Sequence, residues 1–287
     1  DHRDLHLSIR RQRQMCIRDS IEFMGSKEAI AEEKGALARS LPEVGTLLIT
    51  AGCEFAEYFS SRSSARSIPV GNGRGVIRAE SLRTSGEGSF FDLVIDGERN
   101  SGVHLKVAGR HMVNNALLAA GAGWVLGLSP DEICRGLEVA ALTGGRLRCF
   151  ERGGITIYDD TYNANPDSMR AAIGVVADLP EVNGNGRTVV LGVMGELGRF
   201  SEDMHFQVGK HAAQHGLQVV SVGAEAAGIA EGARQAGASM VEHFDKYEDA
   251  ASWLRETLSA GDAVLFKGSR QAAVERVMNE VFPQTTN

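Results

Sequence analysis

The sequence predicts an α/β fold in two parts, the second of them a doubly wound sheet of parallel strands. A chain of 287 residues has room for about two domains. Up to residue 143, short apolar runs are broken by glycines and followed by an alanine-rich segment. From residue 144 onward, segments typical of strands and helices alternate, which indicates βαβ units with helices on both faces of a sheet. We therefore predict a domain boundary near residues 143–145.

The first part begins with a predicted helix that starts after Ser26. The Ser26 hydroxyl can cap the helix, and Glu28 favours the positive end of the helix dipole. Lys34 and Arg39 fall toward the negative end, where cations are favoured. The order of these residues therefore agrees with one helix.

The elements that follow are predicted from apolar runs and from the residues that begin and end them. The apolar residues 46–50 predict a buried strand, and the alanine-rich residues 111–126 predict a helix. A second helix is predicted after Ser129, with Pro130 in its first turn and Glu132 closing a capping box. Between these elements lie three further predicted strands, at residues 75–79, 89–95 and 103–107.

The second part alternates regularly from its first strand to its last helix. Strands are predicted at residues 155–158, 188–191, 219–222, 241–244 and 263–266. Helices are predicted at residues 167–177, 205–215, 225–235, 247–258 and 271–281. This order predicts a parallel sheet with helices on both faces.

Residues 1–20 differ in composition from the rest of the chain. They include Arg10, Arg11, Arg13 and Arg18 and contain neither glycine nor proline. We interpret them as a foreign or disordered leader and leave them out of the predicted fold.

Composition excludes several classes of protein. Hydrophobic residues make up 43% and charged residues 23% of the chain, the balance of a soluble globular protein. A net charge of -7 argues against a nucleic-acid-binding surface, and no apolar run reaches the length of a membrane span. The four cysteines form no CxxC pair, which argues against a zinc site and favours reduced thiols. We expect a cytoplasmic protein without membrane insertion.

Two adjacent aspartates follow the first strand of the second part. Asp159 and Asp160 end this predicted strand, Asn163 and Asn165 follow in the loop, and Pro166 starts the next helix. In doubly wound sheets, ligands bind outside the carboxyl ends of the strands. Helix capping alone would explain Asn165, but it poorly explains the pair of aspartates. The loop is therefore a candidate ligand site.

Three other segments carry polar groups at the ends of predicted elements. A glycine-rich turn with Glu196 follows the second strand, a weak signal because such turns are common there. Lys267 and Arg270 follow the last strand, where they could hold an anion with help from the helix N-terminus, or could form a solvated turn. His111 and Asn115 begin the alanine-rich helix as either a cap or a ligand site.

Taken together and in order, these segments resemble the Mur ligase family. The matching runs are Gly-Arg-His with Asn-Asn-Ala-Leu in 109–117, Gly-Gly-Arg at 144–146, Asp-Asp-Thr-Tyr-Asn-Ala-Asn-Pro-Asp-Ser at 159–168, Gly-x-Met-Gly-Glu-Leu-Gly at 192–198 and Lys-Gly-Ser-Arg at 267–270. Tyr-Asn-Ala-Asn-Pro and Lys-Gly-Ser-Arg resemble the D-alanyl-D-alanine-adding branch in particular. The likeness implies the remainder of a P-loop-type central ATPase domain at 21–143, followed by a Rossmann-like doubly wound C-terminal domain at 144–287.

The resemblance also implies an activity, that of an ATP-dependent acid–amino-acid ligase of peptidoglycan precursor synthesis. Such an enzyme uses ATP and Mg²⁺ to convert the carboxylate of UDP-N-acetylmuramoyl-tripeptide into an acyl phosphate, which the amine of D-alanyl-D-alanine then attacks. Catalysis would consist mainly of placement and charge neutralisation around a phosphoryl transfer. The resemblance further implies a monomer.

Roles for single residues follow from the same resemblance. Lys34 matches a lysine that is carbamylated and then holds Mg²⁺, and Arg146 matches an arginine that reaches the ATP phosphates; both are candidate catalytic residues. His111 and Asn115 match nucleotide-contacting positions, and Asp160 matches an aspartate that binds the ribose. The candidate contacts of the tripeptide and the dipeptide are Asn163, Asn165, Lys267, Ser269 and Arg270.

The sequence departs from the family pattern at several points. It contains no Gly-x-x-x-x-Gly-Lys-Ser/Thr loop, which the family places upstream. Ser20 stands where the family has a metal-binding histidine, Met112 replaces an asparagine and Val193 replaces an aspartate. We therefore expect a chain truncated at its N-terminus and inactive by itself.

Two alternatives remain open on the sequence. One is a sister ligase of the folylpolyglutamate synthetase type, in which residues 162–166 would not be expected as Tyr-Asn-Ala-Asn-Pro. The other is a non-catalytic ligand-binding fragment. A Rossmann dehydrogenase is disfavoured because no Gly-x-Gly-x-x-Gly turn follows a predicted strand.

Overall fold

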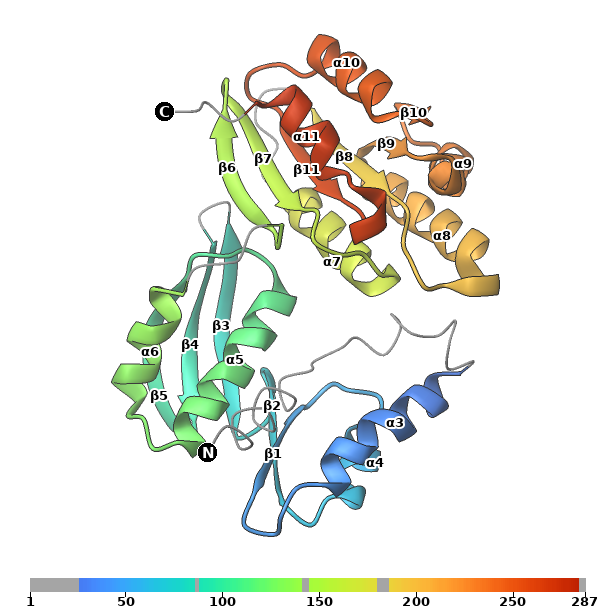
Figure 1. The fold of residues 1–287 in the computed structure, drawn as a ribbon. Helices are drawn as coiled ribbons and strands as arrows, with labels where there is room; N and C mark the ends of the chain where they lie inside the picture. The colour runs from blue at the N-terminus through green and yellow to red at the C-terminus, as the bar shows by residue number, and fades with distance from the viewer. Residues whose placement is uncertain (1–25, 86–87, 141–144, 180–185, 284–287) are drawn as a thin grey trace.

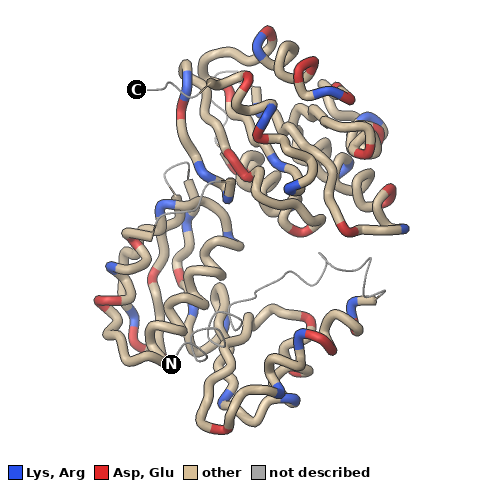
Figure 2. Tube along the Cα trace, in the orientation of Figure 1, with Lys and Arg blue, Asp and Glu red and all other residues tan. Residues whose placement is uncertain are grey.

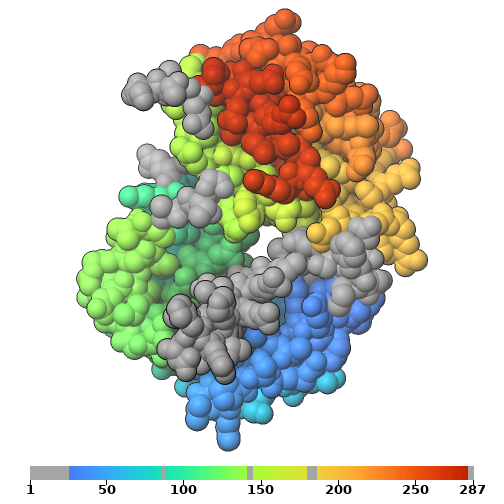
Figure 3. Space-filling model, viewed as in Figure 1, coloured from blue at the N-terminus to red at the C-terminus, as the bar shows by residue number. Residues whose placement is uncertain are grey.

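The computed structural model describes residues 26–85, 88–140, 145–179 and 186–283, which form two β-sheets, each with its own helices (Figure 1). The predicted leader at 1–20 lies outside the described residues, as do Thr143 and Gly144 at the predicted boundary. The two sheets and their helices form two lobes with a hollow between them (Figure 3). Acidic and basic residues are intermingled over both lobes (Figure 2).

The first sheet has the strand order β1-β2-β3-β4-β5 in the described residues. Its strands are β1 (Thr46–Thr50), β2 (Arg66–Asn72), β3 (Ile77–Ser85), β4 (Gly88–Ile95) and β5 (Glu98–Leu105), and its helices are α3 (Lys27–Arg39), α4 (Ala56–Arg62), α5 (Arg110–Val125) and α6 (Pro130–Glu138). Strands β1 to β3 run parallel, whereas β3, β4 and β5 run antiparallel. The core of this lobe forms where α5 and α6 pack on the sheet, with Leu117 and Ile133 against Ile77 and Leu93.

The predicted caps of two helices are confirmed. The Ser26 hydroxyl accepts a hydrogen bond from the Ala29 backbone N–H at 3.1 Å. At α6, the Ser129 hydroxyl accepts from the Glu132 N–H at 3.4 Å, and the Glu132 carboxylate accepts from the Ser129 N–H at 2.9 Å. This is the reciprocal capping box that the sequence predicts.

Strand β1 has the predicted bounds but is not the buried strand that was predicted, because only Ile49 is buried. It lies at the edge of the described sheet, where one side of the strand has no neighbouring strand. Two elements of this lobe, α4 and β2, were not predicted. The N-cap of α4, Phe55, makes no side-chain cap, and Pro69 interrupts the apolar run of β2.

The second sheet has the strand order β10-β9-β8-β11-β7-β6, and all its strands are parallel except β6, which runs antiparallel to β7. Its strands are β6 (Arg148–Arg152), β7 (Ile155–Asp160), β8 (Arg187–Gly192), β9 (Gln218–Val222), β10 (Val241–Phe244) and β11 (Ala263–Lys267), and its helices are α7 (Pro166–Ala177), α8 (Ser201–Gln214), α9 (Ala227–Gln235), α10 (Tyr247–Thr257) and α11 (Glu275–Val281). The predicted doubly wound α/β fold is confirmed.

Helices cover both faces of this sheet. Val189 and Leu191 of β8 pack with Ile173 of α7 in one apolar cluster, together with residues of α8 and α9. Val190 of the same strand packs with Leu254 of α10 in the opposite cluster, together with residues of α11. Since successive strand residues point to opposite faces, one apolar strand serves two cores.

Two sequence predictions in this lobe need correction. Strand β6 was missed, because its sequence is polar and four of its five residues are exposed. The single helix predicted at 271–281 is divided, because Ala273 adopts a left-handed conformation with φ of 45° between a short 3₁₀ turn (Arg270–Ala272) and α11. Among the described residues, no helix is long and apolar enough to cross a membrane.

The two lobes touch where α5 begins. Ala108 belongs to the apolar cluster of the second sheet, although it precedes α5 in the first lobe. Gly109 has a φ of 110°, and a Cβ atom there would lie 3.1 Å from the Val175 side chain of α7. This contact brings the start of α5 against the second lobe.

Candidate functional site at the ends of strands β7 and β11

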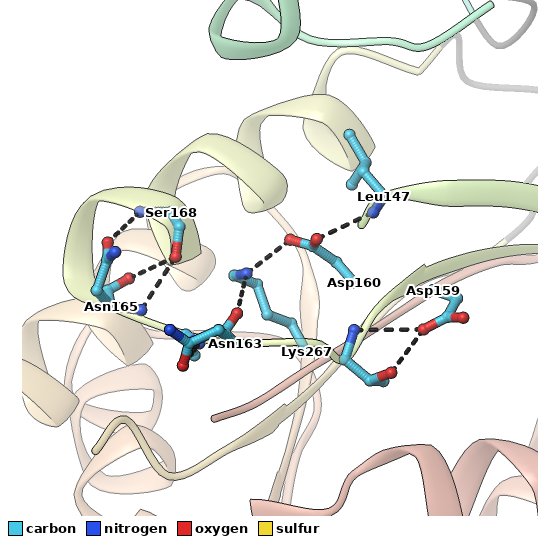
Figure 4. Close-up of polar contacts among 9 residues, drawn as sticks. Leu147, Asp159, Asp160, Asn163, Asn165, Ser168 and Lys267 are labelled. Atoms are coloured by element: carbon cyan, nitrogen blue, oxygen red, sulfur yellow. Dashed lines mark hydrogen bonds and ion pairs between the residues drawn. The ribbon is translucent and has the colours of Figure 1, made fainter. Parts of the chain in front are cut away.

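A buried ion pair joins the ends of two neighbouring parallel strands. Asp160 ends β7 and Lys267 ends β11, and the two residues are register partners. The Lys267 Nζ lies 2.6 Å from Asp160 Oδ2 and also donates to the Asn163 carbonyl at 2.8 Å (Figure 4). The Lys267 side chain is 2% exposed, so the charge is neutralised within the protein. Lys267 therefore fixes the Asp160 carboxylate and the loop after β7.

The segment that carries Arg146 crosses this strand end. The backbone N–H of Leu147 donates to Asp160 Oδ1 at 2.9 Å, so both carboxylate oxygens of Asp160 are engaged. Arg146 itself is exposed, and its guanidinium carbon lies 4.3 Å from the centre of the Tyr162 ring. Such cation–π stacking limits the positions that the guanidinium can take. The Arg146 guanidinium is thus restrained over Tyr162, one residue before the backbone N–H that Asp160 holds.

His111 faces the same strand ends from the first lobe. Burial lowers the pKa of this imidazole below its ordinary value of 6.5, Asp160 opposes the shift and Lys267 adds to it. The influence of both charges shows that the start of α5 lies close to the pair. Asn115, one turn further along α5, is exposed. The structure therefore brings Arg146, Asp160, Lys267 and His111 into one region from distant parts of the sequence.

A separate pocket lies on the second lobe, beyond the ends of β8 and β9. It is lined by Val193, Met194, Gly195, Glu196, Leu197, Gly198, Ser201, Glu225 and Gln271. The Ser269 hydroxyl is buried without a hydrogen-bond partner in the described residues and lies 4.0 Å from the position of a Cβ at Gly195. Glu225 and Gln271 were missed by sequence reasoning, because neither belongs to a recognisable motif.

The loop of this pocket is fixed by a buried histidine. His205 accepts a hydrogen bond from the Met194 N–H at 2.8 Å through Nε2, and its Nδ1 lies 2.7 Å from the Ser201 carbonyl. Burial lowers the pKa of His205, while the contact with Ser201 and the charge of Glu225 oppose this shift. The neutral ring therefore ties the glycine-rich loop to the start of α8.

The remaining predicted site residues have different surroundings. Asn165 is buried and caps α7, with its Oδ1 accepting from the Ser168 N–H at 2.8 Å. Asn163 and Arg270 are exposed. Lys34 lies on α3 in the first lobe, with its Nζ shielded from solvent. The described ranges contain no group of three or more His, Cys, Asp and Glu side chains that could hold a metal ion.

Comparison with known proteins gives consistent matches over both lobes. The profile of the Mur ligase middle domain matches residues 17–123, and that of the Mur ligase glutamate ligase domain matches residues 145–270. The UDP-N-acetylmuramoyl-tripeptide--D-alanyl-D-alanine ligase of Bacillus subtilis (strain 168) is 33% identical over 266 residues, which are 91% of this chain and 56% of that protein. The chain thus spans about half the length of the relatives that it matches.

Solved structures agree with these matches. MurF from Acinetobacter baumannii superposes with a TM-score of 0.81 at 28% identity, covering 92% of this chain and 57% of the other. A Mycobacterium tuberculosis folylpolyglutamate synthase, solved with ADP and AMPPCP, superposes with a TM-score of 0.69 at 19% identity, covering 94% of this chain and 62% of the other. At that identity the second likeness concerns the fold alone.

Proposed function

Because this chain belongs to the Mur ligase family, we propose that it acts in the ATP-dependent joining of D-alanyl-D-alanine to UDP-N-acetylmuramoyl-tripeptide. Residues 21–143 would be part of the middle domain and residues 144–287 the C-terminal domain of a monomeric cytoplasmic enzyme. The observation that carries the proposal is the grouping of Arg146, Asp160 and His111 between the two lobes.

The reaction has two balanced steps. The γ-phosphoryl group of ATP passes to the C-terminal carboxylate of the tripeptide, which gives an acyl phosphate and ADP. The amine of D-alanyl-D-alanine then attacks the acyl carbon, loses a proton and displaces inorganic phosphate, which leaves an amide bond. Both steps concentrate negative charge on phosphoryl oxygens, so a fixed cation and exclusion of water favour them.

The chain's own residues fit distinct parts of this chemistry. Arg146 is exposed yet restrained over Tyr162, as a group that neutralises phosphoryl charge should be. Asp160 is held by Lys267 and by the Leu147 N–H, and its remaining lone pairs can accept from ribose hydroxyls. His111 is kept neutral by burial, so it can meet the nucleotide without an added charge. Asn115 is exposed beside it.

The pocket of the second lobe is the site that we propose for D-alanyl-D-alanine. Glu196 and Glu225 line this pocket and can attract an ammonium group, while the buried Ser269 hydroxyl can donate to a carbonyl or carboxylate oxygen. Arg270 and Asn163 are exposed and remain candidate contacts of the tripeptide. Lys267 and Asn165 support the site by fixing its loop, through the ion pair with Asp160 and the cap of α7.

The described residues contain no group of three or more His, Cys, Asp and Glu side chains that would hold Mg²⁺ without the help of substrate phosphates. Lys34 would add an oxygen ligand only as a carbamate, since a free ammonium repels the ion. Lys34 remains a predicted ligand.

A chimeric ligase tests the proposal. Residues 26–287 would be joined to the part of the Bacillus subtilis ligase that precedes the matched region, and phosphate release would be measured with ATP, UDP-N-acetylmuramoyl-tripeptide and D-alanyl-D-alanine. We expect release that requires all three substrates and falls at least about tenfold with Arg146→Ala. A folded chimera that ligates glutamate to a folate but not D-alanyl-D-alanine would favour the folylpolyglutamate alternative, and one that only binds nucleotide would favour a binding module.

A further inference from the structure

Asp159 is a buried aspartate at the end of β7, 7% exposed, whose carboxylate collects three neutral donors. Its Oδ2 accepts from the Gly145 backbone N–H at 3.2 Å. Its Oδ1 accepts from the Thr161 hydroxyl at 2.7 Å and from the Thr161 N–H at 3.3 Å. The carboxylate therefore connects two backbone segments that lie on either side of β6 and β7 in the sequence.

The two neighbouring aspartates hold alternate amides of one short segment. Asp159 accepts from the N–H of Gly145, and Asp160 accepts from the N–H of Leu147. The Gly145 carbonyl in turn accepts from the Tyr162 N–H at 2.9 Å. Arg146 lies between these two hydrogen-bonded residues in the chain, and its guanidinium lies over the Tyr162 ring. Three hydrogen bonds, two to carboxylate side chains and one between backbone groups, thus fix the residues on both sides of the arginine.

The backbone of this segment is one that needs such support. Leu147 has a φ of 53° and Gly145 a φ of 73°, both in the left-handed region, which glycine alone adopts without steric cost. A residue with a Cβ adopts that region at a cost and stays there only when surrounding contacts over-determine it. Leu147 is buried and held by Asp160, while at Gly145 a Cβ would lie 2.9 Å from the Tyr162 nitrogen. The hydrogen bond to Asp160 opposes relaxation of Leu147, and those to Asp159 and Tyr162 hold Gly145 on the other side of Arg146.

We propose that Asp159 is a positioning residue that holds Gly145 and thereby keeps Arg146 over Tyr162. Arg146 is then carried by the second lobe and moves with Asp160 and Lys267, although it lies at the start of that lobe in the sequence. The consequence for catalysis rests on the proposed function, in which Arg146 meets the phosphoryl group. A cation that is placed in advance does not have to be ordered during the reaction.

Amide hydrogen exchange on the 287-residue chain tests the proposal without any substrate. Asp159→Asn keeps the size of the side chain but turns an NH₂ group or a weaker acceptor toward Gly145. We expect exchange at Gly145 and Leu147 to become about tenfold faster, with exchange at Val190 and Leu265 unchanged. Trypsin cleavage after Arg146 should accelerate to a similar extent.

Two further variants sharpen the test. Thr161→Val removes the hydroxyl that donates to Asp159 Oδ1 but leaves Asp159 Oδ2, which accepts from the Gly145 N–H. Exchange at Gly145 should therefore change less than about threefold. Asp178→Asn makes the same chemical change at an exposed aspartate after α7 and should leave the segment as it is. Unchanged exchange at Gly145 in Asp159→Asn would overturn the proposal. So would an equal rise at Val190, which would make Asp159 a residue of general stability only.

The positioning role and the proposed function can fail separately. In the chimeric ligase, Asp159→Asn should lower kcat with little change in the KM for D-alanyl-D-alanine, in parallel with Arg146→Ala. If Arg146→Ala ligates at the wild-type rate while the exchange pattern holds, the function assigned to Arg146 is wrong and the structural role of Asp159 stands. If the exchange pattern fails, the positioning role is wrong whatever the chimera does.

Discussion

The buried ion pair between Lys267 and Asp160 makes the stability of the second lobe sensitive to the loss of either charged group. The two side chains are 2% and 14% exposed, so removing one partner leaves a charge away from water. We expect Lys267→Met to lower the free energy of unfolding by about 3 kcal/mol. The double variant with Asp160→Asn should recover part of the loss, because the amide oxygen still accepts from Leu147. Urea unfolding measures both, with the exposed Lys210→Met as control; equal losses in the Lys210 and Lys267 variants would contradict the prediction.

His205 makes the same lobe sensitive to acid. Burial lowers its pKa below the ordinary value of 6.5, so the folded state holds the ring neutral while the unfolded chain takes up a proton. The free energy of unfolding should therefore fall as the pH drops through 6.5 toward the lowered value. Urea unfolding at about pH 7.5 and about pH 5.5 should show this loss, and His205→Gln should show a smaller one. An equal pH dependence in the variant would assign the effect to other groups, such as His111.

Lys34 offers the sharpest contrast between a catalytic and a purely structural role. In the chimeric ligase, Lys34→Ala should abolish most turnover at saturating ATP. The reason is that Lys34, as a carbamate, would supply an oxygen ligand to Mg²⁺, and alanine cannot. Added short carboxylic acid should restore part of the rate. Lys27→Ala, on the same helix and in an ion pair with Glu54, should change stability by no more than about 0.5 kcal/mol and leave turnover intact. Unchanged turnover in Lys34→Ala would show that the family role belongs elsewhere.

At the scale of elements, helices α8 and α9 cross at two glycines. A Cβ at Gly209 would overlap the Ile229 carbonyl oxygen, and one at Gly232 would overlap the Phe206 carbonyl oxygen. These contacts are with backbone, so the helices would have to separate. Gly209→Ala or Gly232→Ala should cost more than about 2 kcal/mol.

A matched glycine on α7 provides the control for this prediction. Nothing lies within 4 Å of a Cβ at Gly174. Gly174→Ala should therefore stabilise the protein by up to about 1 kcal/mol, because alanine loses less entropy in a helix. Thermal unfolding that moves in the same direction for all three variants would contradict the close crossing of α8 and α9.

For the whole molecule, we propose that residues 145–287 fold alone. Their sheet is covered by apolar clusters on both faces, and all members of these clusters except Ala108 come from this range. A core of this size suffices for an independent domain. The isolated polypeptide should unfold cooperatively in urea, whereas residues 26–140 alone should be less stable because β1 is an unpaired edge of the sheet as far as the structure describes it. Limited proteolysis that removes the second lobe first would contradict this.

Periodicity and capping residues determined most of the fold from the sequence alone. The strands of the second sheet are apolar runs buried on both faces, and the caps of α3 and α6 are local, so both are visible in neighbouring residues. Strand β6 and helix α4 were not predicted because neither carries a pattern of buried apolar residues. Four of the five β6 residues are exposed, and α4 has no buried residue. The order of the five matching runs was likewise enough to identify the family, because the order of motifs is read directly from the sequence.

Tertiary structure alone decided what the polar residues do. The sequence placed Lys267 and Arg270 together as candidate anion ligands, yet the structure buries Lys267 against Asp160 and leaves Arg270 exposed. Asp159 and Asp160 look equivalent in the sequence. In the structure, Asp159 accepts a hydrogen bond from the Gly145 N–H, whereas Asp160 accepts from the Leu147 N–H and pairs with Lys267. The pocket of Glu225 and Gln271 draws on residues 46 apart in the chain. The physical reason is that apolar burial is encoded in short-range patterns, whereas a polar group's role depends on which partner the fold brings to it from far away.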